Sequence, residues 1–148
     1  MRAVDDVVLA DLEQTPGVDI YDGVSVVDIS TNKVIYDLPL AVYRSNIGDD
    51  ADDSAMLDGF RTRRSVFFDL TYLGVDRNQA KAAGEKLRAR LERRRFVIPG
   101  FRTWPCRLES STRVFRDDDA VTVDGSPLFY GVDSYDISIR LTQRSTYP

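Results

Sequence analysis

The sequence contains no histidine, a single cysteine and no long uninterrupted run of apolar residues. Without histidine, the triad and dyad hydrolase mechanisms that need an imidazole are excluded, and the commonest metal ligand is missing. The lone thiol of Cys106 cannot form an internal disulfide, and no stretch approaches the roughly 18 apolar residues of a membrane-spanning helix. Asp5 and Asp6 lie where a signal peptide would have an uninterrupted apolar run. We therefore expect a protein that matures in a reducing cytosol and contacts no membrane.

Short motifs with a known chemical mechanism are also missing. The sequence has no GxxxxGK or GxGxxG loop for phosphates and no GxSxG nucleophile turn. Cys106 lies between a proline and an arginine with no histidine to activate it, and we interpret it as a small buried apolar residue. The sequence therefore predicts a protein that is not an enzyme and has no catalytic, cofactor-binding or metal-binding residue.

The 148 residues are 43% apolar and 30% charged, which is typical of one soluble globular domain spanning residues 1–148. The net charge of −4 is unevenly distributed along the chain. Residues 1–58 hold 13 acidic and 3 basic side chains, whereas residues 59–148 hold 11 acidic and 17 basic ones. Either the two halves interleave in the fold and their charges mix, or copies of the chain pair an acidic surface with a basic one, head to tail.

Hydrophobic periodicity predicts an α+β domain. A short amphipathic helix is expected over residues 3–13 and the strongest strand over residues 61–73, with one apolar face formed by Val66, Phe68, Leu70 and Tyr72. The aspartates of residues 116–119 predict a loop, and the other strand segments are expected at 18–21, 34–44, 101–115, 120–123 and 128–142. This order predicts a mainly antiparallel, mixed sheet with an N-terminal helix and one longer helix packed on one face.

The longer helix is expected over residues 77–95. Asp76 and Gln79 have the spacing of an N-cap and its capping-box partner. A stripe at helical spacing is expected to pack against the sheet, and its members are Ala80, Ala83, Gly84, Leu87 and Leu91. Because the first half of this stripe has small side chains, that end of the helix should approach the sheet closely.

Residues 45–60 predict a mobile acidic loop. Its cluster of Asp49, Asp50, Asp52 and Asp53 suggests a calcium or magnesium site, but Ser54 and Phe60 replace the glycine and glutamate of an EF-hand loop. The favoured interpretation is a solvated, self-repelling loop that becomes ordered on a partner.

Basic side chains are concentrated in and around the longer helix. They are interpreted as a candidate subunit interface made of Arg63, Arg64, Arg88, Arg93, Arg94 and Arg95. The alternative is nucleic-acid binding through the basic helix 77–95. A pI near 4.8, together with Glu85 and Glu92 on the same helix, argues against that alternative.

Short segments spread over roughly residues 15–142 carry a resemblance to a known family. They are residues 18–23, 40–43, 66–74, 79–80, 87–91, 97–100, 109–111 leading into 116–119, and 130–139. In order and spacing they resemble the tail terminator (tail-completion) proteins of long-tailed double-stranded DNA bacteriophages. Residues 24–38 depart in length from the commoner pattern of that family.

This resemblance implies a structural virion protein, an α+β subunit of a hexameric ring that caps the tail tube, ends its polymerisation and joins it to the head-side connector. The implied partners are further copies of the chain, the tail tube protein and a head-to-tail connector or neck protein. Genome DNA would pass through the lumen without specific binding. The implied location is the head-proximal end of the virion tail, after assembly in the host cytoplasm. Another neck or connector protein and a nucleic-acid-binding module remain as alternatives.

Overall fold

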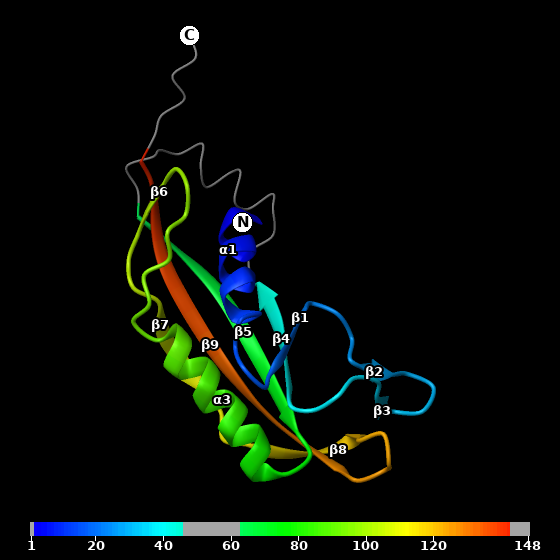
Figure 1. Cartoon of the computed structure of the whole chain (residues 1–148). Helices are drawn as coiled ribbons and strands as arrows, with labels where there is room; N and C mark the ends of the chain where they lie inside the picture. The colour runs from blue at the N-terminus through cyan, green and yellow to red at the C-terminus, as the bar shows by residue number, and fades with distance from the viewer. Residues whose placement is uncertain (1, 46–62, 143–148) are drawn as a thin grey trace.

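A computed structural model describes residues 2–45 and 63–142, which form an α+β fold of two helices and a strongly curled, mixed β-sheet (Figure 1). Neither helix in these ranges is long and apolar enough to cross a membrane. In chain order the elements are α1 (Arg2–Leu12), β1 (Asp19–Asp22), β2 (Val27–Asp28), β3 (Lys33–Val34), β4 (Leu40–Ser45), β5 (Arg64–Gly74), α3 (Arg77–Leu91), β6 (Phe101–Thr103), β7 (Arg107–Ser111), β8 (Phe115–Val121) and β9 (Pro127–Leu141).

The two long strands β5 and β9 form the centre of the sheet. They pair antiparallel, from Arg64 opposite Ile139 to Gly74 opposite Phe129. The other edge of β9 pairs in turn with the shorter strands β6, β7 and β8. The main path of the sheet is β1-β4-β5-β9-β8-β3-β2, in which the β1–β4 and β3–β8 pairs are parallel. The predicted mixed sheet with mainly antiparallel pairing is therefore confirmed.

The main core lies between one face of this sheet and the two helices. Alternate side chains of β5 point into it, and each of the predicted residues Val66, Phe68, Leu70 and Tyr72 is at most 3% exposed. Helix α1 and the neighbouring strands complete this core with Val4, Val8, Leu12, Ala41, Tyr43, Tyr135, Ile137 and Ile139. Both helices thus pack on the same face of the sheet, as the periodicity predicts (Figure 1).

Helix α3 begins where the sequence predicts. The Asp76 carboxylate accepts a hydrogen bond from the Gln79 backbone N–H at 2.7 Å, and the Gln79 side chain accepts one from the Val75 N–H at 2.8 Å. These bonds satisfy N–H groups that have no partner within the helix. The predicted packing stripe is confirmed, since all of its members are buried: Ala80, Ala83, Gly84, Leu87 and Leu91.

The predicted end of this helix at residue 95 is wrong, because α3 stops at Leu91. The Glu92 N–H closes the last turn on the Arg88 carbonyl at 2.9 Å, and Arg93 then adopts a left-handed conformation with φ 66°. The Arg93 N–H donates to the Cys106 carbonyl at 2.8 Å, and the Cys106 N–H donates to the Arg94 carbonyl at 2.8 Å. Pairing with this distant segment replaces the next helical turn.

A smaller apolar cluster lies on the opposite face of the sheet, at one end. Leu40 and Val42 of β4 point into it, away from the helices. The β2–β3 hairpin covers this end with Val26 and Val34. Residues 34–44 therefore hold the end of β3 and most of β4, separated by Pro39, in agreement with the predicted one or two strands.

The aspartates of residues 117–119 lie in β8, so the loop expected there is wrong. Arg116 and Asp117 pair with Phe129 and Leu128 of β9, and the register then shifts before Val121. Within the irregular part, the Asp117 carboxylate accepts hydrogen bonds from the N–H groups of Asp119 at 2.8 Å and Ala120 at 3.1 Å. A bulge of this kind lets the strand continue through consecutive aspartates that have low strand propensity.

Candidate assembly surfaces

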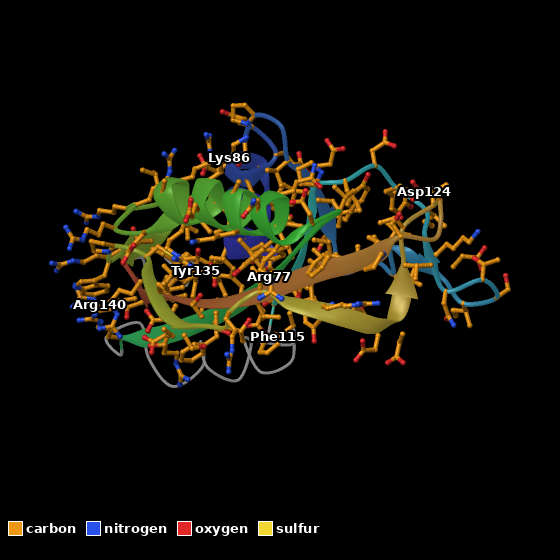
Figure 2. All side chains as sticks on the ribbon, turned by 90° about the horizontal axis from the view of Figure 1, so that it is seen from below. Arg77, Lys86, Phe115, Asp124, Tyr135 and Arg140 are labelled. Carbon is orange, nitrogen blue, oxygen red and sulfur yellow. The ribbon has the colours of Figure 1, made fainter. Side chains whose placement is uncertain are left out.

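Among the described residues, many charged side chains gather by sign at opposite ends, with nitrogen atoms around Arg140 and carboxylate oxygens around Asp124 (Figure 2). The basic end contains Arg63, Arg64, Arg93, Arg94, Arg95, Arg102, Arg107 and Arg140, together with Glu92, Glu109 and the buried Asp136. The acidic end contains Asp19, Asp28, Asp37, Asp76, Asp117, Asp118, Asp119 and Asp124, together with Lys33, Arg77 and Arg116. Over residues 2–45 and 63–142 the two halves of the sequence interleave in the fold, and the charged residues named above lie at one end or the other.

The basic end is built around Trp104. The guanidinium of Arg63 lies 4.3 Å from the centre of the indole ring and that of Arg102 lies 4.9 Å from it. The backbone N–H of Trp104 donates to the Ser138 carbonyl at 3.0 Å, and the Arg63 guanidinium donates to the Ser138 hydroxyl at 3.2 Å. The main chain of Trp104 is therefore held on β9, and the two cations lie close to its indole ring, an arrangement favoured by the ring quadrupole.

A groove of about 410 Å³ opens beside this indole. The segment that follows α3, where Arg93 pairs with Cys106, and the start of β7 both contribute residues to its lining. Its lining combines apolar and charged groups, namely Arg63, Glu92, Arg93, Trp104, Pro105, Cys106, Arg107 and Leu108. Arg107 is already paired with Asp136 at 3.1 Å and Glu109 at 2.8 Å, so Arg63 and Arg93 provide the groove with most of its positive charge.

Cys106 is among the residues of this groove, and its side chain is buried. Burial raises the pKa of the thiol to about 12, with smaller contributions from the nearby carboxylates of Asp136 and Glu92. A thiol that stays protonated at neutral pH is a poor nucleophile. The interpretation of Cys106 as a small buried apolar residue is confirmed by its burial.

We expect the free energy of unfolding to fall as the pH rises above about 9. Burial raises the pKa of Cys106, Tyr43 and Tyr135 in the folded chain. Below the unfolded-state pKa of each group both states hold the proton. Above it only the unfolded state loses the proton, which lowers stability by up to about 1.4 kcal/mol per pH unit for each group.

Denaturant unfolding across the alkaline range measures this slope, with Cys106→Ala as the comparison. The variant is expected to show a shallower decline just above pH 9, before the tyrosines contribute, whatever its stability at neutral pH. Equal slopes for the two proteins in that range would contradict the role assigned to the thiol.

The acidic end presents the β2–β3 hairpin. Its turn is held by Asp28, whose carboxylate accepts hydrogen bonds from the Ser30 N–H at 2.9 Å and the Ser30 hydroxyl at 2.7 Å. These bonds lower the pKa of Asp28, so the carboxylate is charged at neutral pH. Asn32 closes the turn with φ 55°, a conformation that asparagine tolerates. As a result Ile29 stands at the tip with 90% of its surface exposed.

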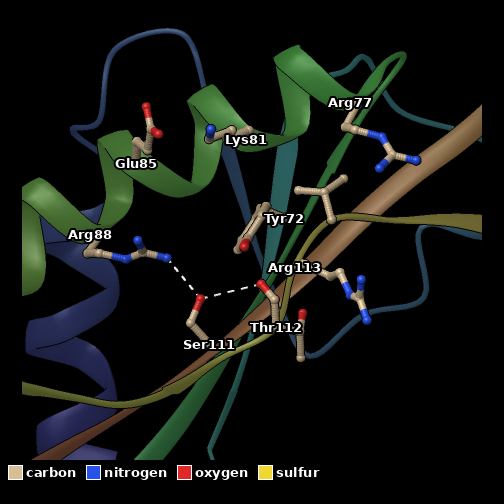
Figure 3. Close-up of a pocket in the computed structure, with 9 residues that line it drawn as sticks. Tyr72, Arg77, Lys81, Glu85, Arg88, Ser111, Thr112 and Arg113 are labelled. Carbon is tan, nitrogen blue, oxygen red and sulfur yellow. Dashed lines mark hydrogen bonds between the residues drawn. The ribbon is translucent and has the colours of Figure 1, made fainter.

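A second hollow, of about 320 Å³, lies between α3 and residues 111–114 (Figure 3). Arg77, Lys81, Arg88 and Arg113 line it together with Glu85. Arg88 points across the hollow to an ion pair with Asp133 of β9 at 3.1 Å, and the Asp133 side chain is 1% exposed. This pair fixes α3 to the sheet, so part of the positive charge in the hollow is neutralised within the protein.

The arginines of the predicted subunit interface fall into two groups. Arg88 lies in the α3 hollow, whereas the others lie together at the basic end: Arg63, Arg64, Arg93, Arg94 and Arg95. Arg94 also reaches Asp11 of α1 at 2.7 Å, where Arg90 forms a second ion pair at 3.1 Å. Since Arg88 and Arg90 are engaged internally, the helix has fewer cations for phosphate contacts than its sequence suggests.

The aspartate clusters were considered from the sequence as a possible metal site. Asp49, Asp50, Asp52 and Asp53 lie outside the described residues. Over residues 2–45 and 63–142, no three side chains of histidine, cysteine, aspartate or glutamate are arranged to hold a metal ion. The carboxylate of Asp117 is instead used by the backbone of the β8 bulge.

Sequence reasoning missed Trp104 and Ile29 as surface features. Trp104 belongs to an expected strand segment, where an aromatic residue indicates a buried position. The flanking residues Arg102 and Pro105 gave some signal of an edge position, since proline cannot donate to a strand ladder. Ile29 lies in residues 24–33, for which no element is expected from the sequence. Comparison with known proteins adds no assignment, because no protein-family model and no curated protein sequence matches this chain.

Proposed function

We propose that this chain is a structural virion subunit, a tail terminator that closes into a hexameric ring on the end of the tail tube. The ring ends tube polymerisation and joins the tube to the head-side connector. The observation that carries the proposal is the separation of charge onto two ends of one subunit, arginines around Trp104 and carboxylates around the β2–β3 hairpin.

Separated charges of this kind favour one mode of self-association. Two copies that meet through the same end repel each other, whereas the basic end of one copy attracts the acidic end of the next. Such a head-to-tail contact is heterologous: it repeats from copy to copy and forms a ring when the rotation between copies closes. A closed ring with one face for the tube and one for the connector is what a terminator requires.

Native mass spectrometry of the purified protein, alone and with the tail tube protein of the same phage, tests this proposal. Six copies of 16.7 kDa give a ring of about 100 kDa. We expect that species alone or on addition of the tube protein, and we expect tubes polymerised with the chain present to be shorter and closed at one end. Raising the salt concentration should weaken the ring, because opposite charges at the subunit contacts are screened.

A chain that stays monomeric or dimeric with the tube protein, and leaves tube length unchanged, would contradict the proposal. Binding to duplex DNA with a steep dependence on salt would instead favour the nucleic-acid-binding alternative, because counterion release gives each phosphate contact a measurable salt slope. An assembly of another stoichiometry that binds a head-side protein but not the tube would favour another neck component.

A further inference from the structure

We propose that the β2–β3 hairpin of one subunit docks into the Trp104 groove of the next, with Ile29 as its apolar anchor. This inference rests on the proposed ring and names the contact that joins its subunits. The occupant of the groove is thus a second copy of this chain, bound through an acidic turn with an isoleucine at its tip.

The groove has the form of a receptor for such a turn. Its lining includes the apolar side chains of Trp104, Pro105 and Leu108, and its volume is about 410 Å³. Arg63 and Arg93 supply positive charge beside these apolar groups. Fully desolvated pockets with an aromatic residue at the base and arginines nearby are typical of the positions that contribute most to binding between proteins.

The hairpin has the complementary form. Ile29 is 90% exposed, and Asp28 beside it carries a charge that the turn itself stabilises. Further apolar side chains of the same end are also exposed, namely Val24 at 44%, Ile35 at 52% and Val123 at 67%. A single exposed isoleucine is ordinary, but several at one end of a domain, surrounded by carboxylates, indicate an interaction surface.

The hairpin and the groove of one subunit cannot meet each other. The hairpin lies beside β8 at one end of the sheet, whereas the groove lies at the start of β7, toward the end that carries β6 (Figure 1). Contact between them therefore requires two copies. Because each copy then offers one hairpin and one groove, the contact repeats in one direction around a ring.

Two substitutions separate the two halves of this contact. Ile29→Arg removes the anchor and adds a charge that the groove repels, while its own groove stays intact. Arg93→Asp reverses the charge at the groove, while its own hairpin stays intact, and aspartate accepts the left-handed conformation at this position. Both positions are exposed, so we expect melting temperatures close to that of the wild type.

The decisive measurement is native mass spectrometry of each variant and of their equimolar mixture, at the concentration where the wild type forms rings. Each variant alone is expected to be monomeric, with self-association at least about 30-fold weaker than that of the wild type. The mixture is expected to associate at least into dimers, because one intact hairpin and one intact groove remain. The control Val75→Arg, an exposed site outside the hairpin, is expected to form rings.

Two results would overturn the inference and leave the ring proposal intact: rings from either variant alone, or a mixture that stays monomeric under conditions where the wild type forms rings. Where the wild type closes only with the tube protein present, the same mixture is measured with it. A wild-type chain that forms no ring under either condition rejects the proposed function itself, and this inference with it.

Discussion

Replacing Arg88 with methionine is expected to lower the free energy of unfolding by about 3 kcal/mol. The substitution leaves the Asp133 carboxylate buried on β9, with its side chain only 1% exposed, and removes the cation 3.1 Å away. The hydroxyls of Ser111 at 2.5 Å and Tyr135 at 3.4 Å still donate to that carboxylate. They supply hydrogen bonds but no compensating charge, so the buried anion remains unfavourable.

Replacing the other partner of the ion pair, Asp133→Asn, is expected to lower the free energy of unfolding by less, on the order of 1–2 kcal/mol. The Arg88 side chain is 33% exposed, so water can solvate the guanidinium when its partner is lost. Removing both charges in Arg88→Met/Asp133→Asn should therefore recover much of the loss caused by Arg88→Met alone, because no buried charge is left unpaired.

Chemical denaturation of the four proteins in this double-mutant cycle gives the coupling between the two side chains. Lys86→Met, at an exposed position of the same helix, is the matched control and is expected to change stability by less than about 0.5 kcal/mol. If Arg88→Met were as mild as Lys86→Met, the ion pair would not anchor α3 to the sheet.

The elements with strong local periodicity could be predicted from the sequence. Along β5, the alternation of apolar residues placed Val66, Phe68 and Leu70 on the buried face. Along α3, the spacing of Ala80, Ala83 and Leu87 identified the packed stripe. These predictions succeed because burial of one face imposes a period of 2 on a strand and about 3.6 on a helix. The helix start was equally readable, since Asp76 is adjacent to the residues that it caps.

Elements decided by distant contacts could not be predicted in this way. Arginine favours helices, so the sequence predicts that residues 93–95 continue α3. In the structure Arg93 pairs instead with Cys106, which is distant in the sequence. Asp118 and Asp119 favour turns, and only their position against the long edge of β9 makes that segment a strand.

The groove at the basic end could not be predicted from the sequence either, because it too depends on distant contacts. Arg63, Arg93 and Trp104 lie far apart in the sequence and meet only because β5, the end of α3 and the β6–β7 connection converge there. The arginines could be proposed as an interface from their charge alone. Their arrangement around an indole and other apolar groups could not, because it depends on the pairing of β6 and β7 along β9.

Replacing Gly84 with leucine is expected to destabilise the fold by about 3 kcal/mol. A Cβ atom at this position of α3 would lie 2.8 Å from Cζ and 2.9 Å from Cε2 of the Tyr72 ring. The ring cannot turn aside easily, because it also covers Gly131 of β9, directly opposite Tyr72 in the strand register, where a Cβ would lie 2.5 Å from Cε2. The tyrosine is thus held between a helix and a strand that each approach it through a glycine.

The direction of the stability change caused by Gly84→Ala distinguishes contact with the Tyr72 ring from helix propensity alone. In an exposed helix Gly84→Ala would stabilise by about 1 kcal/mol through helix propensity alone. Here the added methyl group meets the ring at less than the usual contact distance, so we expect a net loss of about 1 kcal/mol instead. Ala82→Leu, at an exposed position of the same helix, serves as the control for added bulk and should be nearly neutral.

A second substitution, at Tyr72, tests whether its ring causes the destabilisation by Gly84→Leu. Tyr72→Val is destabilising alone, because it empties part of the core, but it opens the space that a side chain at position 84 needs. Gly84→Leu in the Tyr72→Val background should therefore be milder than in the wild type by at least about 1 kcal/mol, measured by denaturant unfolding of the four proteins in the cycle. Equal costs in the two backgrounds would mean that the leucine is excluded by the backbone of the sheet and not by the ring.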